Sequence, residues 1–239
     1  MPAKNPASAT VEARPHDELG ETRSGGLAGR HHFCFASYQR PDRLEWGGLR
    51  ALHFYTLRAG ERRAPSFHAG FEIVTLVTAG ALRRLGSFDP RQPLLPGSVE
   101  LISTGVGADL GLEAISEGPA SFTEIWIASN RPMMDARRQW LPRLDEAAMT
   151  VLATGARAKA PRLCADAELL RVRLPAGGRF TRILGADERA YLAVETGDVA
   201  AAGARAGAGD ALAIRGPGRL RVTAGDATQF LFVRVGPRR

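Results

Sequence analysis

The stretch Ser66-Phe67-His68-Ala69-Gly70-Phe71-Glu72, followed by Ile73-Val74-Thr75-Leu76-Val77-Thr78-Ala79-Gly80, has the pattern of a strand that enters a small β-barrel. Side chains two residues apart on a strand share a face, so we expect Ser66, His68 and Glu72 to point together into the barrel. Two histidines at this spacing would present imidazoles to one metal ion, but the first position holds Ser66. Because Ser66 stands where a second histidine would be needed, the sequence does not predict a histidine pair for a metal here.

The rest of the chain has the spacing of short strands and turns that is typical of an all-β protein. Short runs rich in β-branched and aromatic residues are separated by turns that contain Gly and Pro. Several runs alternate apolar and polar residues, as half-buried sheets do. The predicted strands are Leu49–Leu57, Phe71–Val77, Ser98–Ser103, Ser121–Ala128, Leu169–Leu174, Tyr191–Glu195, Ala211–Arg215 and Gln229–Val235.

The order of turns and strands repeats, which predicts two similar halves. We expect a disordered tail over residues 1–10, an N-terminal barrel over 11–130 and a C-terminal barrel over 161–239. The linker between them, residues 131–160, contains the two helix candidates, Pro132–Trp140 and Asp145–Leu152.

Several segments, in this order, resemble the pirin family of the cupin superfamily. They are His32–Pro41, Gly48–His53, the signature His68-Ala69-Gly70-Phe71-Glu72-Ile73-Val74-Thr75, Leu95–Glu100, Thr104–Gly107 and Thr123–Ile127. The resemblance covers roughly residues 11–140 well and the C-terminal part more loosely. It implies an all-β fold of two jelly-roll cupin barrels, a bicupin, with the short helices between them.

The resemblance also implies a single iron bound by three His and one Glu. Carried over residue by residue, these positions are Ser66, His68, Leu110 and Leu112. Transition-metal sites need about three or four N, O or S ligands, and one imidazole facing two leucines does not provide them. We therefore predict no metal and no other cofactor, with His68 as a neutral pocket histidine.

An unorthodox ligand set remains as an alternative. His53, Glu72 and Glu113 could substitute for the missing ligands beside His68, if they converge at the barrel mouth. Glu113 lies one residue beyond the expected Glu, and a one-residue slip on a strand turns its side chain to the opposite face. Only a local bulge would bring Glu113 inward.

Some pirins act as quercetin 2,3-dioxygenases, chemistry in which a metal activates the substrate and O₂. Loss of three of four ligands argues against an enzyme here. The sequence therefore predicts a non-catalytic module that binds a small apolar molecule or a protein partner. The alternative is a metal-dependent, quercetin 2,3-dioxygenase-like oxidoreductase that uses iron or another divalent metal through the substitute ligands.

Composition favours a cytoplasmic protein without nucleic-acid or membrane partners. The net charge of +7 and pI of about 10.3 come from scattered arginines, with lysine only at Lys4 and Lys159, and no nucleic-acid-binding motif accompanies them. No apolar run approaches the ~20 residues of a membrane span. Two cysteines, Cys34 and Cys164, provide no disulfide framework, although Arg162 beside Cys164 leaves a redox role open.

Overall fold

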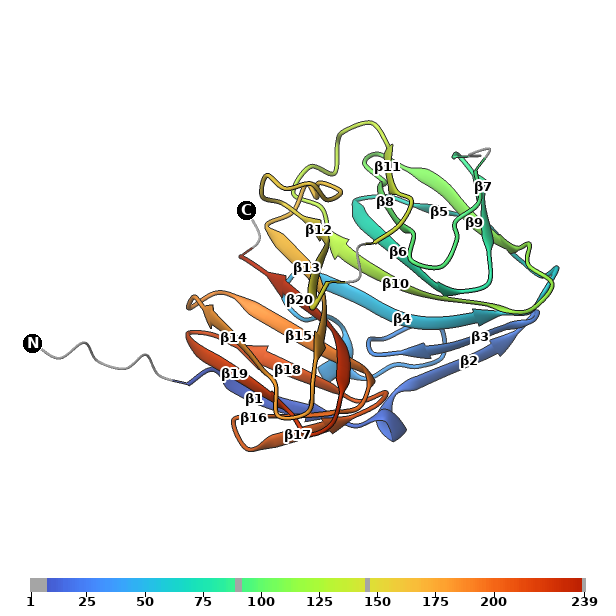
Figure 1. The fold of residues 1–239 in the computed structure, drawn as a ribbon. Coiled ribbons are helices and arrows are strands. Elements are labelled where there is room, and N and C mark those ends of the chain that lie inside the picture. Colours follow the sequence, from blue (N-terminus) through green and yellow to red (C-terminus); the bar gives the residue numbers. More distant parts are fainter. Residues whose placement is uncertain (1–7, 89–91, 145–146, 238–239) are drawn as a thin grey trace, which may run out of the picture.

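Two β-barrels lie side by side and share one wide interface (Figure 1). The computed structural model describes residues 8–88, 92–144 and 147–237. All strand pairings between named strands in these residues are antiparallel. Across the same residues, no helix has the length and apolar character needed to cross a membrane.

The first barrel is a seven-stranded sheet closed by a three-stranded sheet. The larger sheet has the order β11-β8-β6-β10-β4-β3-β2, and the smaller has the order β5-β9-β7. Their strands are β2 (Gly20–Ser24), β3 (Leu27–His31), β4 (Leu49–Leu57), β5 (Arg62–His68), β6 (Phe71–Ala79), β7 (Leu82–Gly86), β8 (Val99–Ser103), β9 (Ala108–Ala114), β10 (Ala120–Ala128) and β11 (Arg137–Leu141).

The second barrel pairs a six-stranded sheet, β1-β18-β15-β20-β13-β12, with a four-stranded sheet, β14-β19-β16-β17. Its strands are β1 (Thr10–Arg14), β12 (Met149–Thr154), β13 (Ala167–Leu174), β14 (Arg179–Leu184), β15 (Arg189–Thr196), β16 (Asp198–Ala201), β17 (Ala204–Gly207), β18 (Ala211–Arg215), β19 (Gly218–Ala224) and β20 (Thr228–Val235). The all-β, two-barrel expectation is thus confirmed.

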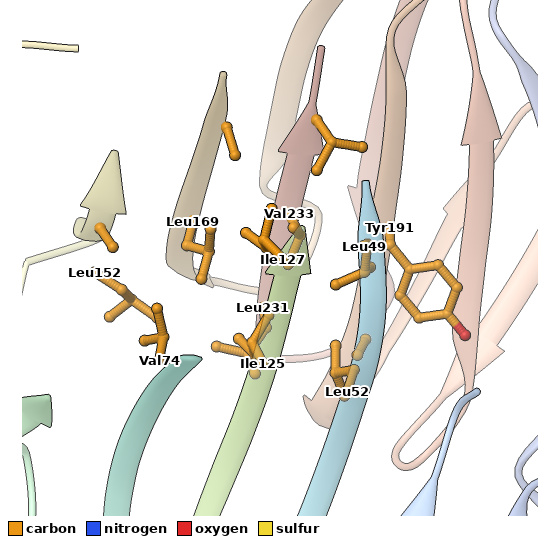
Figure 2. Packing of buried hydrophobic residues seen from close by; sticks show 14 of the residues in the cluster. Leu49, Leu52, Val74, Ile125, Ile127, Leu152, Leu169, Tyr191, Leu231 and Val233 are labelled. Carbon is orange, nitrogen blue, oxygen red and sulfur yellow. The ribbon is translucent and has the colours of Figure 1, made fainter. Parts of the chain in front are cut away.

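The largest sheets of the two barrels pack face to face through one hydrophobic core. Strand alternation sends Ile125 and Ile127 of β10 toward the second barrel, while Glu124 and Trp126 point into the first. Figure 2 shows this packing, with Leu49, Leu52, Val74, Ile125 and Ile127 facing Leu152, Leu169, Tyr191, Leu231 and Val233. Each such buried side chain stabilises the fold by roughly 1.5–3 kcal/mol, which joins the barrels firmly.

The expected helices between the barrels are wrong for the described residues. The segment Pro132–Trp140 instead runs into β11, which pairs in register with β8, and Asp145–Leu152 runs into β12, which pairs with β13. Pairing with a neighbouring strand has overridden the local helix signals. Asp145 and Glu146 lie outside the described residues. The helices in the described chain are two 3₁₀ turns, η1 (His16–Glu18) and η2 (Pro41–Arg43).

The N-terminal strand belongs to the second barrel, so the expected boundaries at 11–130, 131–160 and 161–239 need correction. β1, the blue strand beside the orange and red ones in Figure 1, pairs with β18 of the second barrel. β11 and β12, both from the expected linker, belong to the first and second barrel respectively. Of the expected disordered tail, residues 1–7 lie outside the described residues, whereas Ser8 bridges Arg219 and Ala9 is buried.

Candidate functional site

The mouth of the first barrel holds Ser66 and His68 on β5. The Ser66 Oγ and His68 Nε2 atoms are 3.0 Å apart and share a hydrogen bond. The half-buried His68 ring packs edge-on against Trp126, with 4.8 Å between ring centroids. Burial lowers the pKa of His68, which favours the neutral imidazole.

Leu110 and Leu112 on β9 face the barrel interior. Leu110 pairs directly with Ser66 across the strands and packs in a cluster with Ile73 and Ile102. Leu112 is fully buried in a separate apolar cluster with Tyr55 and Leu82. Neither leucine has an electron pair to offer a metal.

These four positions do not fit the metal that the family resemblance implies. They present one hydroxyl, one imidazole and two hydrocarbon side chains, whereas zinc, iron or nickel sites need three or four N, O or S donors. Within residues 8–88, 92–144 and 147–237, no three His, Cys, Asp or Glu side chains gather closely enough to hold a metal.

His53 is buried inside the first barrel and is hydrogen-bonded to another histidine. Its Nδ1 lies 2.9 Å from Nδ1 of His31 on the neighbouring strand β3. Burial, followed by repulsion from His31, lowers the pKa of His53 to about 3. Its Nε2 has no hydrogen-bond partner among the described residues, and its ring lies 6.0 Å from that of Trp126.

Glu72 points away from the barrel interior, which corrects the expectation that it shares a face with Ser66 and His68. β5 ends at His68 and β6 begins at Phe71, and Gly70 between them has φ of +76°. This turn breaks the two-residue alternation. Glu72 is fully buried on the other face, where it accepts hydrogen bonds from Ser103 Oγ, Ser129 Oγ and the Cys164 backbone N–H.

Glu113 lies on the outer face of the smaller sheet. It pairs with Arg62 of β5 at 2.7 Å and with Arg83 of β7 at 3.3 Å. The structure therefore does not bring His53, Glu72 and Glu113 together around His68.

The barrel interior instead contains two carboxylates that sequence reasoning missed, each bound by arginine. Arg63 Nη1 and Nη2 donate to both carboxylate oxygens of Glu124, at 2.8 and 2.5 Å. Arg84 donates to Glu100, Thr75 Oγ1 and the Gly111 carbonyl oxygen. A sequence signal existed for Glu124, because it alternates with Phe122 and Trp126 on the inward face of its strand.

Electrostatics keep the Arg63–Glu124 pair ionised. Burial alone would raise the pKa of Glu124, but the charge and hydrogen bonds of Arg63 outweigh burial and lower it to about 2. Burial opposes the charge of Arg63 as well, yet attraction to Glu124 raises its pKa. Both side chains are therefore charged at neutral pH.

A groove of about 530 Å³ runs between the two barrels, away from the mouth of the first. Nonpolar atoms form most of its lining, with Ala28, Phe54 and Val194 contributed by both barrels. The lining also contains charged side chains, among them Arg171, which with Gln229 donates to Glu195 at 2.9–3.1 Å.

Known proteins align with nearly the whole chain. A Pseudomonas aeruginosa protein named "Putative quercetin 2,3-dioxygenase" is 34% identical over 235 residues, which cover 94% of this chain and 99% of that protein. A "Pirin-like protein" of Caulobacter vibrioides is 28% identical and covers 93% of this chain and 98% of its own length. The chain belongs to the pirin family.

A family model and a solved structure agree with the two-barrel fold. The quercetinase C-terminal cupin domain matches residues 150–235, which lie in the second barrel. Bacterial pirin YhhW from Escherichia coli, solved in complex with nickel(II), superimposes with a TM-score of 0.89 at 23% identity, covering 95% of this chain and 100% of YhhW. The expected bicupin fold is therefore confirmed.

Proposed function

We propose that this pirin-family chain is a non-catalytic module that binds a small apolar molecule in the groove between its barrels. One observation carries the proposal: the carboxylates inside the first barrel, Glu124 and Glu100, are held by arginines. These two carboxylates are thus neutralised by ion pairs and need no metal as a counter-charge.

A divalent cation would meet an unfavourable environment in this barrel. It would have to displace Arg63 from both oxygens of Glu124, leaving a half-buried guanidinium without its partner. The buried Arg84 would add a second positive charge nearby, and charges of like sign repel strongly where water is excluded. The neutral His68 alone does not offset these costs.

The groove supports a small-molecule ligand. Its volume of about 530 Å³ lies within the usual range of ligand pockets, and such pockets combine an apolar lining with a few polar groups that fix orientation. Phe54 offers an aromatic surface, and the Arg171–Glu195–Gln229 network offers polar anchors. A flat apolar molecule with one polar edge matches this lining.

The alternative is a metal-dependent dioxygenase that uses substitute ligands. The names of the relatives favour it, as does the nickel in the YhhW structure. It requires His53 to leave His31, Glu72 to leave its two serines, and Glu113 to leave Arg62. Three separate rearrangements make this the less favoured function.

We place the module in the cytoplasm, in keeping with its two free thiols. Cys34 Sγ is engaged with the backbone of Arg40, and Cys164 Sγ accepts a hydrogen bond from Arg137.

Two assays on the purified protein test the proposal together. The first is fluorescence titration with the neutral apolar probe N-phenyl-1-naphthylamine, and the second is quercetin consumption under air. Saturable probe binding without quercetin consumption supports a binding module. Quercetin consumption that a chelator abolishes supports the dioxygenase and overturns the proposal.

A further inference from the structure

A second pocket, of about 610 Å³, lies where the two barrels meet near the end of β10. Its walls come from the segment after β10, from β11, from both ends of the loop over residues 155–166 between β12 and β13, and from β20. Arginine dominates this lining. The pocket contains Arg131, Arg137, Arg162 and Arg234 but a single acidic residue, Asp166.

The positive charge of this pocket is only partly balanced by nearby carboxylates. Arg234 pairs with Asp166 at 3.0 Å and with Glu188 at 2.9 Å. Arg131, Arg137 and Arg162 have no carboxylate partner within the part of the chain that the structure describes. Elsewhere, arginines such as Arg63, Arg84 and Arg171 are paired with glutamates. Three unpaired guanidinium groups around one hollow attract anions.

Arg137 is held in place at the floor of the pocket. Its Nη2 donates to Cys164 Sγ and to the Arg162 carbonyl oxygen, both at 3.1 Å, and its Nε donates to Ser103 Oγ at 3.4 Å. Its Nη1 donates to no described residue. Arg137 is therefore oriented in advance, with donors left over for a ligand.

Neighbouring polar groups fix the rest of the floor. The Gln139 side chain donates to the Arg162 carbonyl oxygen at 2.9 Å and accepts from the Arg162 N–H at 2.8 Å, which clamps that backbone. Behind the floor, the buried Glu72 accepts from Ser103 Oγ and from the Cys164 N–H. The exposed side chains of Arg131 and Arg162 stand at the rim.

We propose that this pocket binds a small organic anion with two or more carboxylate or phosphate groups. Guanidinium groups match the planar, bidentate geometry of both anions, and the volume admits one metabolite-sized molecule. The site is separate from the apolar groove, because the two share no lining residue. The ligand also differs in class, being strongly charged.

Isothermal titration calorimetry with citrate, and separately with inorganic phosphate, tests this proposal. We expect binding of one molecule per chain, with the tighter probe distinguishing a carboxylate from a phosphate ligand. The rim variant Arg131→Gln/Arg162→Gln should weaken binding at least about tenfold, because it removes two charge-assisted contacts. The matched variant Arg205→Gln/Arg221→Gln removes two exposed arginines outside the pocket and should bind as the natural protein does.

Alkylation of Cys164 locates the bound anion. In a Cys34→Ser background, the tighter of the two anions should slow the reaction of Cys164 with iodoacetamide, since Cys164 lines the same pocket. The proposal is overturned if neither probe binds, or if the two double variants weaken binding equally, which would indicate unspecific attraction to a basic protein. Binding that leaves the alkylation rate unchanged would also overturn it.

Discussion

Arg63 and Glu124 form a two-point ion pair inside the first barrel, with hydrogen bonds of 2.8 and 2.5 Å. Glu124 is 1% exposed, and the Arg63 guanidinium also lies over the rings of Tyr55 and Phe122. The pair places two opposite fixed charges in the interior of the first barrel. Its importance to the fold can be measured directly.

Breaking this pair should destabilise the protein strongly. We expect Arg63→Gln to lower the free energy of unfolding by about 3 kcal/mol or more, because it leaves a buried carboxylate without its counter-charge. Urea unfolding followed by circular dichroism measures this change. The control Arg62→Gln removes the more exposed pair with Glu113 and should cost less than about 1 kcal/mol. Equal losses would contradict the structural role of Arg63.

Three buried histidines should make the protein sensitive to mild acid. Burial lowers the pKa of His31 to about 4, and of His32 and His53 to about 3, from an ordinary value of 6.5. Below pH 6.5 the unfolded chain binds protons that the folded chain does not, so stability falls as pH drops toward the folded-state values. The loss is on the order of 1 kcal/mol per histidine per pH unit.

Unfolding free energies measured between about pH 7.5 and pH 4.5 check this slope. His32→Phe should make it shallower, whereas replacement of the exposed His16 by Gln should not change it. Glu124 acts in the same direction at lower pH, since its stabilisation is complete above its ordinary pKa of 4.5 and disappears as the pH falls toward 2. A flat profile over this range would be inconsistent with neutral buried histidines.

Glu72 should behave as a structural residue. Glu72→Gln places an amide among groups that donate to it, Ser103 Oγ, Ser129 Oγ and the Cys164 N–H, so we expect a loss of about 1–3 kcal/mol in unfolding free energy. Glu113→Gln, the matched change at the outer face, should cost less. Metal content should be unaffected by either substitution. A Glu72→Gln protein that is fully stable but has lost bound metal would make Glu72 a ligand.

Filling the groove should abolish binding of the apolar probe. Ala28 is half-buried on β3 and lines the groove, so Ala28→Trp should occupy space needed by N-phenyl-1-naphthylamine while leaving the barrels intact. We expect at least about tenfold weaker probe binding. The control Ala186→Trp adds the same ring at an exposed turn outside the groove. Unchanged binding by Ala28→Trp would place the apolar site elsewhere.

Many strands of this fold could be predicted from the sequence, because a strand with one buried face alternates apolar and polar residues. The predicted Leu49–Leu57 and Ala211–Arg215 coincide with β4 and β18. The strands of the linker could not be predicted, since β11 and β12 are held by pairing with other strands, β8 and β13. The placement of β1 in the second barrel depends on a partner distant in sequence, β18, and leaves no local signal.

The composition of the candidate site remains a prediction from the sequence, and its geometry could not be predicted. Ser66, Leu110 and Leu112 were assigned to the ligand positions that the family resemblance implies, because the motifs of the chain follow the order of that family. The orientation of Glu72 could not, because the turn at Gly70 interrupts the alternation on which the expectation depended. The His31–His53 contact and the Arg63–Glu124 pair join side chains on different strands, which a single sequence does not bring together.

Elemental analysis of protein purified without added metal and without a His tag tests the central claim most directly. We predict no stoichiometric iron, nickel, copper or zinc in the natural protein. The variant Ser66→His/Leu110→His/Leu112→Glu, verified as folded by circular dichroism, should take up about one metal, because it restores a four-ligand set. One metal per chain in the natural protein would contradict the account and make His53, His68, Glu72 and Glu113 the next residues to substitute.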